Sequence, residues 1–299
     1  MQPGGQMQQR NFGSTGLSVS ALGFGAGQIG GESFDEAGAS VLLNTAIDCG
    51  ITLIDTARGY GLSEERIGRH LAHRRSEFVL STKVGYGIAG HADWTYGCVV
   101  AGINAALARL QTDVIDIVHL HSCPMETLLA DGVIAALSRA REQGKIRVAA
   151  YSGENAELAW AISSGHFDSV ECSVNLFDQG SLHEVLPRAA ASGLGIIAKR
   201  PLGNAPWRFM HRPDGDYCEI YWQRMQALGF DTCGLPWDAF ALRFGAFAPG
   251  VCSAIVGTAS IAHLRHNVAL VEAGALPPEA VEQVDRRYRE LGAGWTGQI

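Results

Sequence analysis

Short apolar segments alternate with amphipathic segments along most of the chain. In residues 51–68, four mostly aliphatic or β-branched residues precede the carboxylate of Asp55, Tyr60 follows between two glycines, and a helical pattern begins at Ser63. Equivalent apolar segments predict eight strands, at 21–25, 51–55, 77–83, 116–121, 146–152, 169–173, 195–199 and 252–256. Segments with helical periodicity lie between or after them, at 35–50, 64–71, 97–110, 127–143, 155–164, 182–191 and 260–271.

This alternation predicts the fold class. Strands that alternate with helices form a parallel sheet, and eight such units in about 250 residues close most economically into a (β/α)8 TIM barrel. An open, doubly wound sheet shares the alternation and is the alternative. It is disfavoured because the glycines from Gly23 to Gly31 lack the GxGxxG spacing of a dinucleotide-binding turn. Since no break in composition divides the chain, we expect residues 1–299 to form a single barrel domain.

Three segments lie outside the repeating pattern. Residues 10–20 have short apolar stretches around a glycine turn and predict a small N-terminal hairpin that acts as a lid or plug. Residues 277–291 predict an extra C-terminal helix. The connection at 203–236 is rich in aromatic residues, and we expect it to help build a ligand pocket. The alternative is a satellite cluster that covers a helix.

Composition and charge narrow the class of protein. With 47% hydrophobic and 18% charged residues, the chain can bury a large core. A net charge of −7 without a basic run argues against a nucleic-acid partner, and no apolar run approaches the roughly 18 residues of a membrane span. Residues 1–9, rich in Gln and Gly, are expected to be flexible and are neither signal peptide nor anchor. Seven cysteines without a CxxC pair suit free thiols in a reducing cytoplasm.

Reactive side chains stand at the carboxyl ends of several predicted strands. These are Asp55, Lys83, His121, Ser152 and Lys199. In a closed parallel barrel all carboxyl ends of the strands lie on one face, where barrel enzymes keep their active sites. Together with Tyr60, the first three of these residues should therefore converge from neighbouring units. Taken singly, each of them could equally be a structural ion pair or a satisfied polar group.

The chemistry that suits this set is acid–base chemistry. A tyrosine with an ordinary pKa of about 10 is a poor acid or base at neutral pH. A neighbouring Lys83 ammonium would lower the pKa of Tyr60, and Asp55 would hold that ammonium in place. His121 would orient and polarise a carbonyl group by hydrogen bonding. None of these groups supplies electrons, so carbonyl reduction would need a hydride donor such as nicotinamide.

Five motifs resemble the aldo-keto reductase family: DTARGYGLSE at 55–64, STK at 81–83, LQTDVIDIVHLH at 110–121, GKIR at 144–147 and AKRPLG at 198–203. The resemblance implies reversible reduction of aldehydes or ketones, with NADP(H) or NAD(H) as cofactor and a small-molecule carbonyl or alcohol as substrate. It also implies that the catalytic residues are Asp55, Tyr60, Lys83 and His121. The family places its histidine at position 121, so His119 is interpreted as interior packing.

The resemblance further implies that the cofactor lies across the mouth of the barrel. By position, Gly25 and Ala26 would approach the nicotinamide and diphosphate, and Ser152 would bond the carboxamide. The other expected cofactor positions are Gly153, Glu171, Lys199, Pro201, Leu202, Gly257, Thr258, Ser260, His263 and Asn267. Three of them depart from the family pattern, because Gly153 replaces an Asn, Glu171 a Gln and Lys199 an aromatic residue.

The adenosine end of the cofactor is expected at a helix that begins after Ser260, where free backbone amides would face a phosphate. Many family members place Lys and Arg around the 2′-phosphate of NADP. This chain has Gly257 and His263 there, and Arg265 differs in spacing by two residues. The resemblance therefore leaves both cofactors open.

The substrate is expected at a rim formed by Gln28, Trp94, Tyr96 and Trp207, which suits a sugar-like carbonyl as readily as an aromatic aldehyde. An oxidoreductase is the leading class of function. The alternatives are a nicotinamide-binding regulatory subunit with little turnover, and a metal-dependent barrel lyase or isomerase that uses His119, His121 and Glu171. We expect no metal, because a metal ligand set leaves no use for a Tyr–Lys pair. The sequence assigns no role to Arg58.

Overall fold

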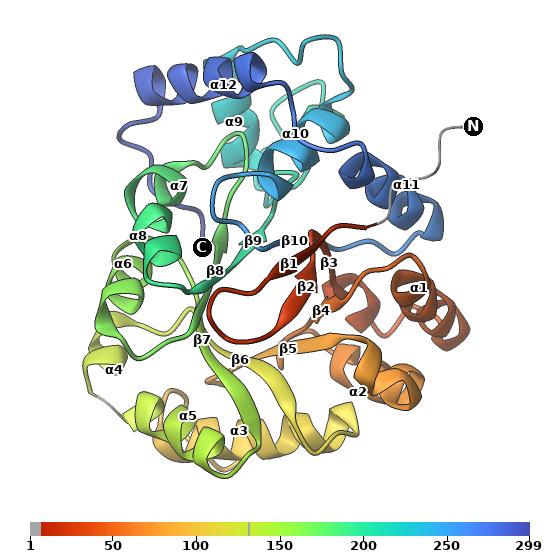
Figure 1. Ribbon diagram of the computed structural model, residues 1–299, viewed down its shortest axis with the longest axis vertical. Helices are drawn as coiled ribbons and strands as arrows, with labels where there is room; N and C mark the ends of the chain where they lie inside the picture. Colours follow the sequence, from red (N-terminus) through yellow and green to blue (C-terminus); the bar gives the residue numbers. More distant parts are fainter. Residues whose placement is uncertain (1–6, 131) are drawn as a thin grey trace.

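The computed structural model describes residues 7–130 and 132–299. Eight parallel strands close into a barrel in the order β10-β3-β4-β5-β6-β7-β8-β9, and helices surround it (Figure 1). The strands are β3 (Leu22–Gly25), β4 (Leu53–Asp55), β5 (Val79–Val84), β6 (Ile115–His121), β7 (Ile146–Ser152), β8 (Ser169–Ser173), β9 (Gly195–Lys199) and β10 (Ser253–Val256). The predicted (β/α)8 TIM barrel is confirmed.

Alternate residues of each strand serve two different cores. Ile54, Leu80 and Val118 belong to the large core between the strands and the surrounding helices. Their neighbours Leu53 and Val79 belong to the core inside the barrel. Because successive side chains of a strand point to opposite faces, a strand that is buried on both faces reads as a continuous apolar run. This explains why the strands were easy to predict from the sequence.

The helices around the barrel are α1 (Glu36–Asp48), α2 (Ser63–Leu71), α3 (Tyr96–Leu110), α4 (Met125–Leu129), α5 (Gly132–Glu142), α6 (Asn155–Ser164), α7 (Gly180–Glu184), α8 (Leu186–Ala191), α10 (Trp237–Ala246) and α11 (Ile261–Glu272). The helix predicted at 182–191 is divided between α7 and α8. Val185 leaves helical geometry at φ −123°, and Pro187 lacks the N–H that would continue a helix through the first turn of α8. The helix predicted at 127–143 corresponds to α4 and α5, and residue 131 lies outside the described residues.

The N-terminal hairpin is a plug. Strands β1 (Gln9–Asn11) and β2 (Ser18–Ser20) pair antiparallel, and Phe12, Leu17 and Val19 are buried among the inward-facing residues of the barrel strands. In Figure 1 the hairpin lies across the opening of the barrel. The expectation of a flexible segment at 1–9 is wrong for residues 7–9, because Met7 packs in the core and Gln9 belongs to β1. Residues 1–6 lie outside the described residues.

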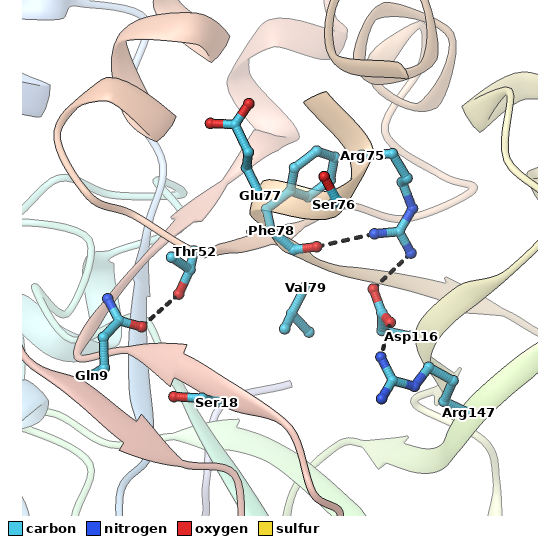
Figure 2. A pocket seen from close by; sticks show the side chains of 10 residues that line it. All are labelled: Gln9, Ser18, Thr52, Arg75, Ser76, Glu77, Phe78, Val79, Asp116 and Arg147. Atoms are coloured by element: carbon cyan, nitrogen blue, oxygen red, sulfur yellow. Dashed lines mark hydrogen bonds and ion pairs between the residues drawn. The ribbon is translucent and has the colours of Figure 1, made fainter. Parts of the chain in front are cut away.

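A hollow of about 260 Å³ opens at the amino-terminal end of the barrel, beside the hairpin (Figure 2). Arg75, in the short helix η2 (Ala72–Glu77), and Arg147 of β7 both bind the buried carboxylate of Asp116, with N–O distances of 2.6 and 3.0 Å. Asp116 also accepts a bond of 2.9 Å from the backbone N–H of Leu80. The two arginines and Asp116 are therefore paired with one another, and they join the starts of three neighbouring strands.

The aromatic connection at 203–236 builds a second core outside the barrel. It contains η3 (Pro206–Arg208) and α9 (Glu219–Leu228), and its aromatic rings pack with α10 and with the extra C-terminal helix α12 (Pro278–Leu291). The extra helix is confirmed. The sequence predicted neither α9 nor α10, because their aromatic residues have modest helix propensity and their burial depends on partners distant in the chain. The satellite cluster, which was the alternative interpretation, describes this connection.

The cysteines of the chain, seven in number, are free thiols, and five of them are buried. Among the described residues, no helix combines the length and the apolar character that are needed to cross a membrane.

Candidate active site

Four polar side chains meet at the carboxyl ends of β4, β5 and β6. Lys83 donates hydrogen bonds to the carboxylate of Asp55 and, at 3.1 Å, to the backbone carbonyl of Thr56. The ammonium of Lys83 lies 5.6 Å from the centre of the Tyr60 ring. The rings of Tyr60 and His121 meet edge to face with their centres 6.1 Å apart. The structure thus brings together the four residues that the sequence placed at neighbouring strand ends.

Tyr60 is seated by the short helix η1 (Ala26–Gly30), which follows β3. A Cβ atom on Gly30 would overlap the Tyr60 carbonyl oxygen, and one on Gly27 would lie 3.6 Å from the Tyr60 ring. The backbone N–H of Leu62 donates to the Gly30 carbonyl at 2.9 Å, and the hydroxyl of Ser63 donates to the Ala26 carbonyl at 2.9 Å. The glycines after the first strand therefore make room for the loop that carries Tyr60.

Arg58 connects two loops at this end of the barrel. Its backbone N–H donates to the Lys83 carbonyl at 3.1 Å, and its guanidinium donates to the Gly87 carbonyl at 3.3 Å. The first bond continues the pairing of the chain beyond β4 and β5. The second ties the Tyr60 loop to the segment that carries Tyr86. Arg58 thus has a place in the structure that the sequence did not indicate.

Tyr86 is a partner of His121 that the sequence did not indicate. Its hydroxyl lies 2.7 Å from His121 Nδ1, and the two rings are stacked with their centres 5.6 Å apart. Burial lowers the pKa of His121 to about 3, and burial raises the pKa of Tyr86. At neutral pH the imidazole is therefore neutral and the phenol protonated, so a single hydrogen bond joins the Tyr86 hydroxyl and Nδ1. The only sequence signal was an aromatic residue three positions after Lys83.

Glu171, in the middle of β8, belongs to the same buried cluster. Its Oε2 atom lies 3.3 Å from Lys83 Nζ and 3.7 Å from His119 Nε2. Its Oε1 atom accepts a hydrogen bond of 3.2 Å from the hydroxyl of Ser152. The side chains of Lys83 and Glu171 are only 1% and 2% exposed, so water screens their charges very little. The barrel therefore surrounds one ammonium with two carboxylates.

This second carboxylate changes the acid–base balance of the site. Burial raises the pKa of Asp55, and the charge of Glu171 raises it further. Burial lowers the pKa of Lys83, but Asp55 and Glu171 outweigh burial and raise it. Lys83 is the strongest influence on Tyr60 and lowers its pKa, yet burial and the two carboxylates together raise the pKa of Tyr60 above its ordinary value. The expected influence of Lys83 is therefore present, but the net shift of the Tyr60 pKa is upward.

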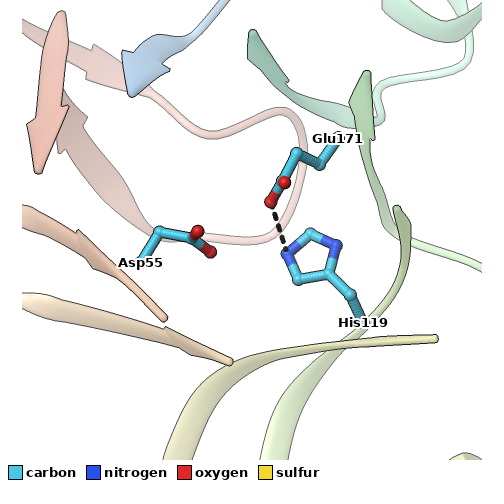
Figure 3. A group of neighbouring side chains, drawn as sticks. All are labelled: Asp55, His119 and Glu171. Atoms are coloured by element: carbon cyan, nitrogen blue, oxygen red, sulfur yellow. Dashed lines mark ion pairs between the residues drawn. The ribbon is translucent and has the colours of Figure 1, made fainter. Parts of the chain in front are cut away.

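Asp55, His119 and Glu171 offer oxygen and nitrogen atoms within 4.8 Å of one another (Figure 3). His119 is fully buried, bonds the Ser81 hydroxyl at 3.1 Å, and is neutral because burial lowers its pKa to about 4. The ammonium of Lys83 already binds Asp55 and lies beside Glu171. A divalent cation at this place would be repelled by that ammonium. We therefore interpret the group as the polar interior of the acid–base site.

The carboxyl-terminal segment folds back to this face of the barrel. Gly297 exchanges two hydrogen bonds with the Asn155 side chain, at 2.8 and 3.2 Å. The backbone N–H of Gln298 donates to Asp178 at 3.0 Å, and Arg200 donates to the Gln298 carbonyl. In Figure 1 the end of the chain lies close to β8. The pattern of the sequence did not indicate this contact, which joins residues far apart in the chain.

Comparison with known proteins places this geometry in a family. The model of the Aldo/keto reductase family matches residues 21–289. The chain belongs to this family. It is 27% identical over 303 residues to L-galactose dehydrogenase of Arabidopsis thaliana, with 94% of each chain covered. It is 31% identical over 214 residues to a probable voltage-gated potassium channel subunit beta of Oryza sativa subsp. japonica, with 66% of this chain and 65% of the relative covered.

A solved structure agrees with this assignment. The holo form of an aldo-keto reductase from Bacillus halodurans matches the chain with a TM-score of 0.79 and 26% sequence identity, over 94% of this chain and 96% of the other. The aldo-keto reductase family and the dehydrogenase relative make this protein an oxidoreductase.

Three of the expected cofactor positions of this aldo-keto reductase lie at strand ends on the face that carries Tyr60. Gly25 ends β3, Ser152 ends β7 and Lys199 ends β9, where its ammonium lies 3.3 Å from Glu154. Ser260 caps α11 by accepting a bond of 3.3 Å from the backbone N–H of His263. The other positions lie in η1 (Ala26), after β7 (Gly153), in β8 (Glu171), after β9 (Pro201, Leu202), after β10 (Gly257, Thr258) and in α11 (Asn267).

The donors on this face fit a dinucleotide. The 12-residue helix α11 presents its amino terminus there, which favours a phosphate group. Within the described part of the chain, the buried side-chain amides of Asn175 and Asn204, after β8 and β9, have no hydrogen-bond acceptor for Nδ2. Diphosphate oxygens would satisfy such donors. The family asparagine at position 153 would not fit, because a Cβ on Gly153 would lie 2.5 Å from the Tyr151 hydroxyl.

The four expected substrate residues have different surroundings. Trp94 meets the Tyr86 ring edge to face at 5.7 Å and thereby lies next to the partner of His121. Gln28 is exposed in η1, on the segment that seats Tyr60. Tyr96 lines a small hollow with residues of α3 and α5, and Trp207 stacks on Trp237 at 5.8 Å in the satellite core. The structure therefore brings Trp94 and Gln28 toward the site, while the contacts of Tyr96 and Trp207 are with other parts of the fold.

Proposed function

We propose that this aldo-keto reductase transfers hydride between a nicotinamide cofactor and a sugar-like carbonyl or alcohol, with Tyr60 as general acid and base. The observation that carries the proposal is the packing of Tyr60 against the buried Lys83–Asp55 pair and the neutral His121 ring. The bound nicotinamide would supply or accept the hydride. The residues of the chain supply binding, orientation and the proton.

Each side chain has a defined task in the reduction direction. In this mechanism His121 accepts a hydrogen bond from Tyr86 at Nδ1 and carries its own proton on Nε2, from which it donates to the substrate carbonyl oxygen and draws charge toward that oxygen. Tyr60 transfers its hydroxyl proton to the same oxygen as the alcohol forms. Lys83 stabilises the phenolate left on Tyr60, and Asp55 holds the ammonium in place. In the oxidation direction the phenolate accepts the proton of the alcohol.

A sugar-like substrate is supported by two features. The aromatic faces of Tyr86 and Trp94 beside His121 can stack on the apolar side of a sugar ring. The relative from Arabidopsis thaliana is an L-galactose dehydrogenase. Absorbance measurements at the nicotinamide band, with NAD and NADP against panels of aldoses, aldehydes and ketones, test the substrate class. Turnover of aromatic aldehydes alone would contradict it.

The role of Tyr60 is tested by Tyr60→Phe, which keeps the ring and removes the proton. We expect kcat to fall by about 10²- to 10⁴-fold, the usual contribution of a general acid, while the dissociation constant of the cofactor stays within about twofold. Tyr288→Phe, in the satellite core, is the matched control and should turn over like the wild type. Undiminished turnover in Tyr60→Phe would remove this residue from the mechanism.

Both NAD(H) and NADP(H) are candidate cofactors. His263 and Arg265 of α11 are both exposed, so either could reach a 2′-phosphate. Dissociation constants measured side by side decide the matter, and a preference of about a hundredfold for one cofactor would exclude dual use.

A regulatory subunit with little turnover is the second candidate, and the likeness to the potassium channel subunit beta favours it. Such a protein would bind the cofactor yet fail to turn over every substrate of the panel, and it would copurify with a stable partner. The presence of Asp55, Tyr60, Lys83 and His121 in one cluster supports the enzyme instead.

A further inference from the structure

Glu171 is a buried acid that faces the lysine of the acid–base site. It stands on β8, across the barrel from β5, and its Oε2 atom lies 3.3 Å from Lys83 Nζ. Among the described residues, this oxygen has no hydrogen-bond donor, whereas Oε1 is bonded by Ser152. The contact of Oε2 with Lys83 is therefore mainly one of charge. A carboxylate that is 2% exposed can remain ionised only if a nearby cation compensates it, and Lys83 is that cation.

The groups around this contact leave Lys83 as its main source of positive charge. The titratable groups around the Glu171–Lys83 contact are Asp55 of β4, Tyr60, Lys83 of β5, Tyr86, His119 and His121 of β6, and Lys199 of β9. Both histidines are neutral at neutral pH, since burial lowers the pKa of His119 to about 4 and that of His121 to about 3. Lys199 is paired with Glu154 at 3.3 Å. Lys83 must therefore serve two carboxylates and the Tyr60 ring at once.

We propose that Glu171 is a positioning residue of the proton-transfer step: as a second counter-ion of Lys83, it opposes the stabilisation of the Tyr60 phenolate by that ammonium. This inference rests on the proposed function, in which Tyr60 donates the proton. With a neutral amide at position 171, the ammonium would have one carboxylate less to neutralise and would stabilise the Tyr60 phenolate more strongly. With Glu171 present, oxidation, which needs the phenolate, is displaced to more alkaline pH.

The raised pKa of Tyr60 agrees with this arrangement, because Glu171 is one of the charges that raise it against the effect of Lys83. A different role for Glu171 would be to bond only the carboxamide of the cofactor. The two roles differ in what they do to Tyr60 in the protein without cofactor. A carboxamide contact has no effect there, whereas a counter-ion of Lys83 acts whether or not the cofactor is bound.

The experiment is a titration of Tyr60 in the cofactor-free protein. Tyrosinate absorbance is recorded against pH for each protein and for the same protein carrying Tyr60→Phe, and the difference isolates this one phenol. In Glu171→Gln, which keeps the shape of the side chain, we expect the midpoint to fall by about one pH unit or more. Glu171→Asp, which withdraws the carboxylate by one methylene group, should give an intermediate shift. The pH at which sugar oxidation reaches half its maximal rate should fall in the same order.

Glu64→Gln is the matched control. Glu64 is equally buried, but it binds Thr82 and Arg109 outside the barrel, at 2.7 Å each, and its replacement should leave the Tyr60 midpoint unchanged. An unchanged Tyr60 midpoint in both Glu171 variants would overturn the inference. If the dissociation constant of the cofactor also rose at least tenfold in these variants, Glu171 would be a cofactor contact only. If Glu171→Gln does not fold, the midpoint of the Tyr60 titration in Glu171→Asp tests the inference by itself. Failure of the proposed function appears elsewhere, as undiminished turnover in Tyr60→Phe.

Discussion

Replacing Tyr86 by phenylalanine isolates the hydrogen bond that orients His121. The hydroxyl of Tyr86 lies 2.7 Å from His121 Nδ1, and the rings are stacked with an interplanar angle of 28°. Tyr86→Phe keeps the stack and the contact with Trp94 and removes only the donor. Nδ1 then loses the one hydrogen-bond partner that it has among the described residues, and with it the bond that would favour a proton on Nε2.

The size of the effect follows from the burial of the bond. Loss of one partner of a buried hydrogen bond costs about 1–3 kcal/mol. Tyr86 is only half-buried, so water can partly replace its hydroxyl, and the lower part of that range applies, at about 1–2 kcal/mol. If His121 uses this orientation only while the carbonyl is being polarised, the full amount appears in the transition state. We therefore expect kcat/KM to fall by about 5- to 30-fold.

Steady-state kinetics with the best sugar or aldehyde of the panel measure this prediction, alongside the dissociation constant of the cofactor. The cofactor should bind within about twofold of the wild type, since Tyr86 acts through His121. Tyr288→Phe again serves as the control for loss of a hydroxyl elsewhere in the fold. A decrease of less than about twofold in kcat/KM would refute the reasoning and leave His121 oriented by its ring contacts alone.

Two further predictions concern stability. Phe12 is fully buried in the barrel plug, so Phe12→Ala should lower the free energy of unfolding by about 3–5 kcal/mol. Urea unfolding should show this loss, whereas Met210→Ala, at an exposed position, should show none. His119, with a pKa of about 4 in the folded chain and about 6.5 when unfolded, contributes stability above pH 6.5 that is lost as the pH falls toward 4. When the pH is lowered from 7 to 5, the free energy of unfolding of the wild type should therefore fall by about 2 kcal/mol more than that of His119→Gln. Equal losses in the two proteins would contradict a lowered pKa for His119.

The sequence predicted the barrel well because the strands carry their own signal. A strand buried on both faces needs an apolar run, and each run here ends at a turn or a polar residue whatever its partners are. The same logic located Asp55, Lys83 and His121 at strand ends, since parallel strands bring those ends to one face. The aromatic connection at 203–236 was harder to predict, because the packing of Trp207 depends on Trp237, in a helix that the local pattern did not reveal.

The sequence by itself determined the order of the elements, the closed parallel barrel and the identity of the four polar residues at its mouth. Tertiary structure alone decided what these residues do to one another. Glu171 and Lys83 come from β8 and β5, and only closure of the barrel sets the distance of 3.3 Å between their charges. The effect of Glu171 on the pKa of Tyr60 depends on such distances and on the exclusion of water, because charge interactions fall with separation and with dielectric screening. No local pattern of residues encodes either quantity.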